Sequence, residues 1–291
     1  MTVPVEHVPV LLKEAVEALR PRPGGGFLDA TVGFGGHAAD ILARSSPDGR
    51  LWGIDRDPEA LSVAESRLAV FGVRVRLARG NYDRAGELFP DVPGGTWDGI
   101  LADLGVSSLQ LLTPERGFSF QREGPLDMRM DPAQPETAAS YVERVNVEEL
   151  EERLVEAGET RFAGKLARLL KSRLFSSTLD LAAAVARTVP RRGRTHPATR
   201  VFMALRLAVN GEMESLKRFL TNAPAWLGPG GRLAVITFHS LEDRVVKRFY
   251  KETPGFSSMK SVTKSPLIPT WEERKRNPRS RSAKLRVFEK R

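Results

Sequence analysis

The chain has 291 residues, of which 41% are hydrophobic, and this is enough for one large domain or two smaller ones. It has no cysteine, which excludes disulfides, thiolate catalysis and cysteine-ligated zinc, and its four histidines are widely separated, so we expect no metal site. It has no apolar run of about 18 residues and no basic, apolar leader at its start, and we therefore expect a cytoplasmic protein with no membrane partner.

The net charge of +9 is distributed unevenly along the chain. Residues 1–113 carry a net charge of −4, whereas residues 114–291 carry +13. Two blocks of the second part are strongly cationic, with +10 over 161–210 and +8 over 251–291. Such clustering is typical of a polyphosphate partner, and the alternative is a solvated surface with an excess of arginine.

Strand and helix signals alternate in the first part of the chain. Helices are expected near 11–19 and over 38–43 and 58–69, and strands over 27–30, 51–55, 73–78 and 99–103. Pro58 is well placed as the first residue of its helix, because Asp57 before it is a good N-cap. Alternation of this kind predicts a parallel sheet with crossover helices.

The pattern changes after residue 108. Residues 147–208 show only helical periodicity, with an apolar stripe formed by Leu150, Leu154, Phe162, Leu166, Leu169 and Leu170. A helix over 213–227 and a buried strand over 230–239 then resume the sheet pattern. We therefore predict an α/β fold in which a sheet domain, formed by residues 1–108 and 211–291, is interrupted by an all-helical domain at 109–210. The basic tail at 274–284 is expected to be mobile unless bound.

A glycine-rich turn, Gly33-Phe34-Gly35-Gly36-His37, follows the first strand, and Asp55 ends the next strand 20 residues after Gly35. A strand, a tight turn, a helix and a second strand that ends in a carboxylate form the nucleoside-binding half of a doubly wound sheet. Gly35 and Gly36 allow the backbone to approach a cofactor closely. Asp55 is placed to accept hydrogen bonds from two ribose hydroxyls.

Two classes of cofactor fit this turn. Gly33, Gly35 and Ala38 satisfy the spacing of a dinucleotide-binding motif, so a nicotinamide cofactor stays open. Asp29, at the end of the first strand, favours S-adenosylmethionine, because a carboxylate attracts its amino group and its sulfonium and repels a pyrophosphate. Tyr82 follows the third strand and is expected to lie against the adenine ring.

Eight further segments occur in order along the chain: 7–12 (HVPVLL), 34–37 (FGGH), 103–108 (DLGVSS), 116–120 (RGFSF), 124–130 (GPLDMRM), 195–200 (THPATR), 238–244 (FHSLEDR) and 277–286 (NPRSRSAKLR). Together they resemble the bacterial 16S rRNA cytidine-N4-methyltransferases, the RsmH or MraW family. The resemblance implies a class I, Rossmann-like methyltransferase fold and S-adenosylmethionine as the donor, with S-adenosylhomocysteine as product. It also implies a cytidine N4 in the decoding region of 16S rRNA as the acceptor, and a homodimer.

The candidate site combines the residue-based assignments with this resemblance. The expected cofactor-binding residues are Gly35, Gly36, His37, Asp55, Tyr82, Asp103 and, from the resemblance, Gln110. Asp103 is also the catalytic candidate, because its carboxylate could accept a hydrogen bond from the methionine amino group or from the cytosine N4. The cations expected to contact RNA phosphates are Arg191, Arg192, Arg194, Arg279, Arg281 and Lys284.

Two other interpretations stay open at this point. A nicotinamide dehydrogenase with a helical substrate domain would use the same glycines. An RNA-binding assembly factor with a vestigial pocket would use the same cations. The loop at 103–106 reads DLGV where many amino methyltransferases carry Asp or Asn, two prolines and an aromatic residue, so that loop supplies no aromatic ring to the target base.

Overall fold

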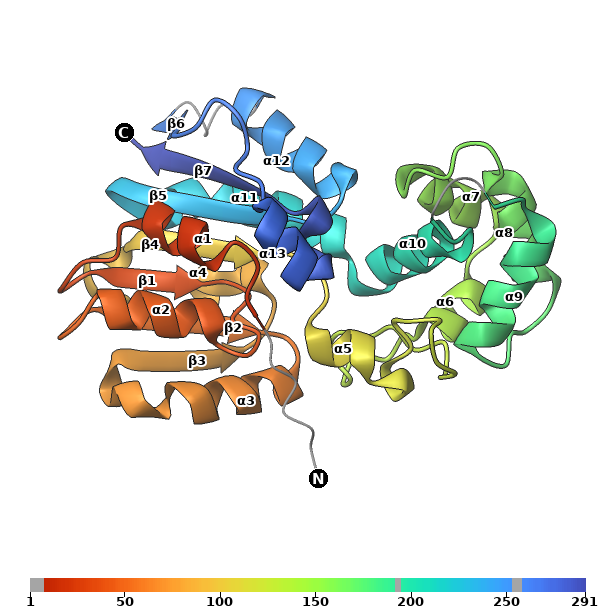
Figure 1. Ribbon diagram of the computed structural model, residues 1–291, viewed down its shortest axis with the longest axis horizontal. Helices are drawn as coiled ribbons and strands as arrows, with labels where there is room; N and C mark the ends of the chain where they lie inside the picture. Colours follow the sequence, from red (N-terminus) through yellow and green to blue (C-terminus); the bar gives the residue numbers. More distant parts are fainter. Residues whose placement is uncertain (1–7, 192–194, 253–257) are drawn as a thin grey trace. The chain divides into compact units, whose positions relative to one another are not determined.

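The computed structural model describes residues 8–191, 195–252 and 258–291. The chain forms two compact units (Figure 1). One consists of Met1–Gly105 with Glu214–Arg291, and the other of Val106–Met213, where the sequence predicts an insertion at 109–210. None of the helices in the described ranges is both long enough and apolar enough to cross a membrane.

A seven-stranded sheet forms the centre of the first unit. Its order is β3 (Val75–Arg79), β2 (Arg50–Asp55), β1 (Gly26–Asp29), β4 (Trp97–Asp103), β5 (Leu227–Thr237), β7 (Lys284–Lys290) and β6 (Met259–Ser261). The first five strands are parallel, and β7 is antiparallel to both of its neighbours. The prediction of an α/β fold with a largely parallel sheet is confirmed. The order reverses between β1 and β4, which is where open α/β sheets bind ligands, beyond the carboxyl ends of the strands.

Seven helices belong wholly or largely to this unit within the described ranges, and most of them bury apolar side chains. They are α1 (Leu12–Leu19), α2 (Gly36–Arg44), α3 (Pro58–Leu68), α4 (Ala85–Leu88), α11 (Glu212–Trp226), α12 (Ser240–Glu252) and α13 (Trp271–Arg276). The first three share one core with the strands, which includes Val16, Ile41, Leu61, Leu101, Ile236 and Leu285. The Asp57 side chain accepts a hydrogen bond from the Glu59 N–H at 3.1 Å, so the predicted N-cap of α3 is confirmed.

A chain of aromatic rings joins α11 to the sheet. Trp97 in β4 lies edge-on to Trp52 in β2 and to Trp226 in α11, with ring centroids 6.4 and 6.3 Å apart. Phe219 in α11 contacts Trp226 at 6.0 Å and Tyr82 at 5.2 Å. These contacts position the segment that follows β3, which carries Tyr82.

The expectation of a mobile tail over 274–284 is wrong. These residues belong to α13 and to a 3-10 helix, Pro278–Ser282, and lead directly into β7. Leu285 and Val287 of β7 are buried and alternate with the half-buried Arg286. This alternation with a period of two predicts a strand and explains why the tail is ordered.

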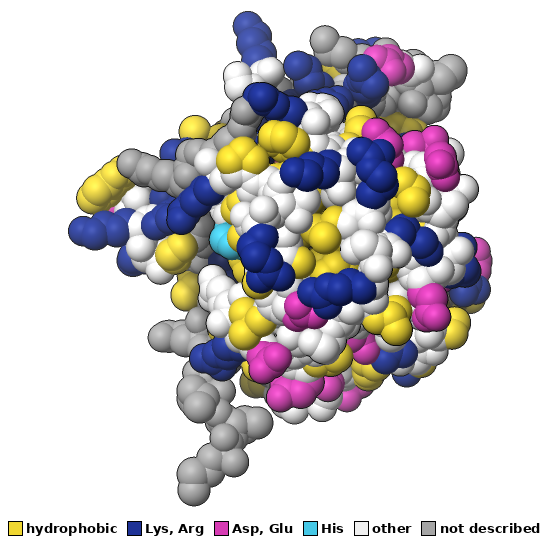
Figure 2. Space-filling view, turned by 90° about the vertical axis from the view of Figure 1, so that its right-hand side faces the viewer, with side chains coloured by type: hydrophobic (Ala, Val, Ile, Leu, Met, Phe, Trp, Pro, Cys, Tyr) yellow, Lys and Arg dark blue, Asp and Glu magenta, His cyan; other side chains and the backbone are white. Residues whose placement is uncertain are grey.

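The second unit is helical. It contains α5 (Ser108–Leu112), α6 (Ala138–Arg144), α7 (Val147–Glu156), α8 (Ala163–Ser172), α9 (Thr178–Thr188) and α10 (Ala198–Asn210). Leu150, Leu154, Leu166 and Leu170 of the predicted stripe are buried in its core, and Phe162 and Leu169 pack against that core. The stripe is shared by two helices, α7 and α8. Figure 2 looks onto this unit and shows lysine and arginine side chains around an apolar area of its surface.

Candidate active site

Three carboxylates end three neighbouring parallel strands of the sheet. Asp29 ends β1, Asp55 ends β2 and Asp103 ends β4, and Asp29 pairs in register with Gly53 and Leu101. Asp29 is 1% exposed, and the other two are half-buried. The three acidic groups therefore meet at the switch point of the sheet, where a ligand is expected.

Burial makes these carboxyl groups unusually reluctant to ionise. Desolvation raises the pKa of Asp29 to about 7, against the lowering effect of the Thr31 N–H, and the charge of Asp55 adds to the rise. Desolvation also raises the pKa of Asp55 to about 6. For Asp103, desolvation and then the charges of Asp29 and Glu242 raise the pKa well above its usual range. A cation placed among these carboxylates would relieve their repulsion, which suits a cationic ligand.

The raised pKa values predict that the free protein loses stability as the pH rises. A carboxyl group whose folded-state pKa exceeds its unfolded value stabilises the fold below the unfolded value, and this contribution is lost as the pH rises through the folded value. For Asp29 that window extends from 3.8 to about 7. At about 1.4 kcal/mol per pKa unit, we expect Asp29 to lower the free energy of unfolding by about 3 kcal/mol between pH 5 and 8.

Urea denaturation of the cofactor-free protein across this range measures the effect. The matched variant is Asp29→Asn, which cannot titrate at this position and is expected to give a flatter curve. Parallel curves for the wild type and the variant would show that Asp29 ionises normally.

The glycine-rich turn is tied to the second carboxylate. The Gly33 N–H donates to Asp55 Oδ2 at 2.9 Å, and the Asp57 N–H donates to Asp55 Oδ1 at 2.9 Å. Gly35 has a φ of 74° and begins α2, and this conformation favours glycine. The carboxylate therefore holds the turn and still has a free lone-pair direction on each oxygen for a hydroxyl donor.

Gly36 is required for a different reason, which is close packing. A Cβ atom at this position would lie 2.4 Å from Pro9 Cγ. Overpacking of this kind costs about 1–3 kcal/mol, and we expect Gly36→Ala to lower the free energy of unfolding by that amount in urea denaturation. Gly164→Ala in α8 is the control, because its added Cβ meets only the flexible carboxylate of Glu151. Equal stability of the Gly36→Ala variant and the wild type would disprove the clash.

Asp103 lies against a buried histidine. Its Oδ2 is 3.7 Å from His37 Nδ1, and His37 Nε2 is 3.1 Å from the Val10 carbonyl oxygen. A carbonyl can only accept, so Nε2 carries a hydrogen and Nδ1 faces the carboxylate. The Asp103 N–H donates to Thr31 Oγ1 at 2.7 Å. This arrangement fixes the Asp103 backbone and brings His37, a predicted cofactor residue, to the same site.

The other carboxylate oxygen of Asp103 is an acceptor without a donor. Asp103 Oδ1 is buried and makes no hydrogen bond to any residue that the structure describes. A buried acceptor of this kind is costly unless a ligand satisfies it. The amino group of a cofactor or of a nucleobase has the right chemistry, so this atom fits the predicted role.

Tyr82 reaches the same edge of the sheet. The Gly80 N–H donates to the Asp55 carbonyl oxygen at 2.9 Å, which joins the segment after β3 to the end of β2. The Tyr82 ring packs edge-on against Phe219, and the neighbouring Asn81 Nδ2 donates to Ser215 Oγ at 2.7 Å. Packing on α11 therefore fixes Tyr82 in the segment that a backbone hydrogen bond ties to Asp55.

Gln110 belongs to the helical unit rather than to the sheet unit. Its backbone N–H donates to Ser107 Oγ at 3.2 Å, and its Oε1 accepts from the Ser107 N–H at 3.0 Å. The two residues form a capping box at the start of α5. A contact between Gln110 and the cofactor stays a prediction.

Glu242 is a residue of the site to which the sequence analysis assigns no role. It is 3% exposed, and its Oε2 accepts hydrogen bonds from the backbone of Phe238 at 2.8 Å and of His239 at 3.2 Å, just after β5. It also contributes to the raised pKa of Asp103. Glu242 therefore orders the loop after β5 and adds a fourth carboxylate to the electrostatics of the site. The only signal in the sequence is its place in the segment FHSLEDR.

The predicted RNA-contacting cations differ in their surroundings. Arg191, Arg279 and Arg281 are exposed. The Lys284 ammonium lies 2.9 Å from Asp243 Oδ2, and Arg286 Nε lies 2.7 Å from Oδ1 of the same carboxylate. Lys284 is thus engaged in an internal ion pair, which makes it less suited to a phosphate contact. Arg192 and Arg194 lie outside the described residues.

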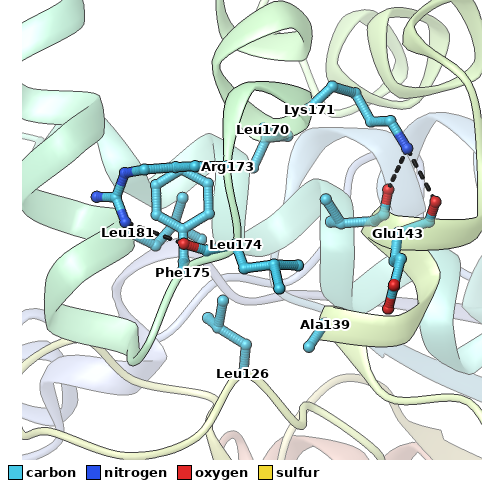
Figure 3. Close-up of a pocket in the computed structure, with 10 residues that line it drawn as sticks. Leu126, Ala139, Glu143, Leu170, Lys171, Arg173, Leu174, Phe175 and Leu181 are labelled. Atoms are coloured by element: carbon cyan, nitrogen blue, oxygen red, sulfur yellow. Dashed lines mark hydrogen bonds between the residues drawn. The ribbon is translucent and has the colours of Figure 1, made fainter.

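The helical unit also contains a cavity of about 220 Å³, and none of the predicted site residues is among the residues that line it (Figure 3). Its walls are mostly apolar, and its cations are engaged elsewhere. Lys171 Nζ donates to the carbonyl oxygens of Val142 and Glu143, and Arg173 stacks on Phe175 and pairs with Asp180. No set of polar groups converges on this cavity, so we assign it no chemistry.

Comparison with known proteins shows the family to which this chain belongs. The α/β sheet with acidic groups at its switch point belongs to a methyltransferase. Residues 4–291 match the model of the MraW methylase family, and the chain belongs to this family. The nicotinamide dehydrogenase considered above is therefore excluded.

Individual relatives agree with this family. The chain is 51% identical over 294 residues to the "Ribosomal RNA small subunit methyltransferase H" of Synechococcus sp. (strain JA-3-3Ab), covering 97% of this chain and 94% of the relative. It is 48% identical over 288 residues to the protein of the same name from Nostoc sp., covering 98% and 92%. A solved rRNA methylase from Streptococcus thermophilus is a more distant likeness, with a TM-score of 0.44 and 12% identity over 96% of this chain and 93% of that one.

Proposed function

We propose that this methyltransferase transfers a methyl group from S-adenosylmethionine to the exocyclic N4 of a cytidine in the decoding region of 16S rRNA. The family and the names of its relatives support an rRNA substrate of the small ribosomal subunit. The observation that carries the reaction is the buried Asp103 Oδ1 at the switch point of the sheet, to which no residue of the described ranges donates a hydrogen bond. The resemblance of the eight segments supports the cytidine N4 as the acceptor.

The residues present at the switch point fit S-adenosylmethionine. Asp55 can accept the two ribose hydroxyls, and the turn at Gly35 and Gly36 follows the strand that ends in Asp29. Tyr82 is assigned to the adenine ring. Asp29 and Asp103 provide negative charge for the amino group and the sulfonium. When bound, the cofactor supplies an electrophilic methyl group on a positively charged sulfur.

The protein has to align a weak nucleophile. The lone pair of a cytosine N4 is delocalised into the ring. The main tasks of the enzyme are therefore to orient the N4 amino group and to polarise its N–H bond. Asp103 Oδ1 can accept one N–H of this amino group and hold it in place. Because its pKa is raised, the same carboxylate can also hold the proton that the amino group releases. His37 Nδ1 lies 3.7 Å from the other carboxylate oxygen, Oδ2.

The RNA is assigned to the cationic blocks of the chain. Exposed Arg191, Arg279 and Arg281 are candidates for phosphate contacts, which position the RNA without reading its sequence. The target base must leave its stack to reach the sheet edge. Recognition by the helical unit, a cofactor contact by Gln110, a homodimer and a cytoplasmic location stay predictions of the resemblance.

The test uses small ribosomal subunits from a strain that lacks this methyltransferase. The purified protein is incubated with them and with methyl-labelled S-adenosylmethionine, and the rRNA is digested to nucleosides for mass spectrometry. We expect label in N4-methylcytidine. Label in another nucleoside would show that the proposed acceptor is wrong. If no nucleoside is labelled although calorimetry shows cofactor binding, the interpretation as an RNA-binding assembly factor is favoured.

A further inference from the structure

Trp271, the first residue of α13, has an exposed indole ring. It is 70% exposed, whereas Trp52 and Trp97 are 4% and 2% exposed. Among the large apolar side chains that are exposed in the described ranges, it is the only aromatic one. The Lys275 ammonium lies 5.2 Å from the ring centroid, one helical turn away. An isolated exposed apolar residue has no special meaning, so the surroundings of Trp271 decide its interpretation.

Those surroundings are cationic. Lys275, Arg276 and Arg281 are exposed, and none of them forms an ion pair with another residue of the described chain. The Nε of Arg274 is buried and has no acceptor within the described ranges. Residues 251–291 carry a net charge of +8. The ring therefore stands among donors that lack anionic partners.

Hydrogen bonds connect this helix to the active site. The Glu273 Oε1 accepts from the Leu11 N–H at 2.8 Å, and Asn277 Nδ2 donates to the Val8 carbonyl oxygen at 3.1 Å. The adjacent Val10 carbonyl oxygen accepts from His37, which faces Asp103. Figure 1 shows α13 beside the carboxyl ends of the parallel strands. The helix that carries Trp271 thus lies near the carboxyl edge of the sheet, where we propose that methyl transfer takes place.

We propose that Trp271 is a stacking platform for an unpaired base of the RNA strand that this enzyme methylates. This inference rests on the proposed function. An aromatic face among cations is the arrangement with which proteins bind single-stranded nucleic acid, because bases stack on the ring while the cations hold the phosphates. Extraction of the target base leaves its neighbours without a stacking partner, and Trp271 can replace that partner. The charge of the segment selects RNA over an apolar protein surface.

The test compares Trp271→Ala, Trp271→Phe and the wild type on unmethylated small subunits and on a protein-free RNA fragment of the decoding region. Loss of one stacked base costs about 1–3 kcal/mol, so we expect Trp271→Ala to raise KM for subunits and Kd for the fragment about 5- to 150-fold. Trp271→Phe keeps a ring and is expected to stay close to the wild type. The Kd for S-adenosylmethionine is expected to stay unchanged in both variants. The control is Val73→Ala, which truncates a 97% exposed apolar residue outside this segment.

The outcomes separate this inference from the proposed function. If the wild type does not methylate cytidine N4, the proposed function fails first. If the wild type methylates and Trp271→Ala matches it, the platform is wrong. A defect of Trp271→Ala with subunits but not with the protein-free fragment would show that the ring contacts a ribosomal protein rather than RNA. That result would overturn the proposal. A defect that Trp271→Phe shares in full would exclude stacking as its cause.

Discussion

Asp103→Asn is expected to abolish methyl transfer and leave the fold intact. The variant keeps the size of the side chain. It removes the negative charge of the carboxylate and its capacity to accept a proton at the buried Oδ1. Loss of one preorganised electrostatic group in an active site costs about 10²–10³ in rate, and we expect a fall of at least that size in the single-turnover rate at saturating S-adenosylmethionine. Rapid-quench measurement of labelled rRNA gives this rate directly.

Asp98→Asn is the matched control for this variant. Asp98 lies on the same strand, β4, but near its other end, where Oδ2 accepts from the Gly26 N–H at 2.8 Å. Its loss is expected to lower stability slightly and to leave the single-turnover rate unchanged. A rate for Asp103→Asn within tenfold of the wild type would remove Asp103 from the centre of the reaction.

Asp55→Asn is expected to weaken the binding of S-adenosylmethionine strongly. A hydrogen bond to a charged group contributes about 1.5–3 kcal/mol, so loss of the carboxylate is expected to raise Kd about 10- to 150-fold in calorimetry. The amide cannot accept from the Gly33 N–H, the Asp57 N–H and two hydroxyls together, because one of its two polar atoms is a donor. The glycine-rich turn would therefore lose one of its anchors as well.

Asp57→Asn separates cofactor binding from local folding. Asp57 is buried and only two residues away, but its side chain caps α3, and asparagine is as good an N-cap as aspartate. We expect its Kd for the cofactor to match the wild type. If both variants weaken binding equally, the effect is a general distortion of the loop after β2 rather than the loss of a ribose contact.

The sheet and its acidic edge could be predicted because their signals are local. Each of Asp29, Asp55 and Asp103 ends an apolar run, and parallel strands bring their carboxyl ends together whatever the details of packing. The strand predicted over 51–55 is β2, Arg50–Asp55, and the helix over 58–69 is α3, Pro58–Leu68. The N-cap and the proline at the start of α3 fixed that boundary well.

The remainder depends on contacts between distant parts of the chain. Glu242 acts through the backbone after β5 and through its field at Asp103, and neither follows from its position in the sequence. β7 pairs with β5, which lies far away in the chain, and the basic residues before β7 lead instead to the prediction of a mobile tail. Trp271 shows no periodicity at all, and only its exposure beside the cations of α13 distinguishes it.

The order in which the sheet is built has a consequence for synthesis. The hydrogen bond between Leu11 and Glu273 joins residues separated by 262 positions, and β4 pairs with β5 only after the whole helical unit has been made. A nascent chain therefore emerges from the ribosome with the edge of β4 uncovered, and such edges invite wrong pairing. The segment whose Val10 carbonyl holds His37 is anchored through Leu11 only once Glu273 has been made. The site around His37 and Asp103 can therefore be completed only after α13 has been synthesised.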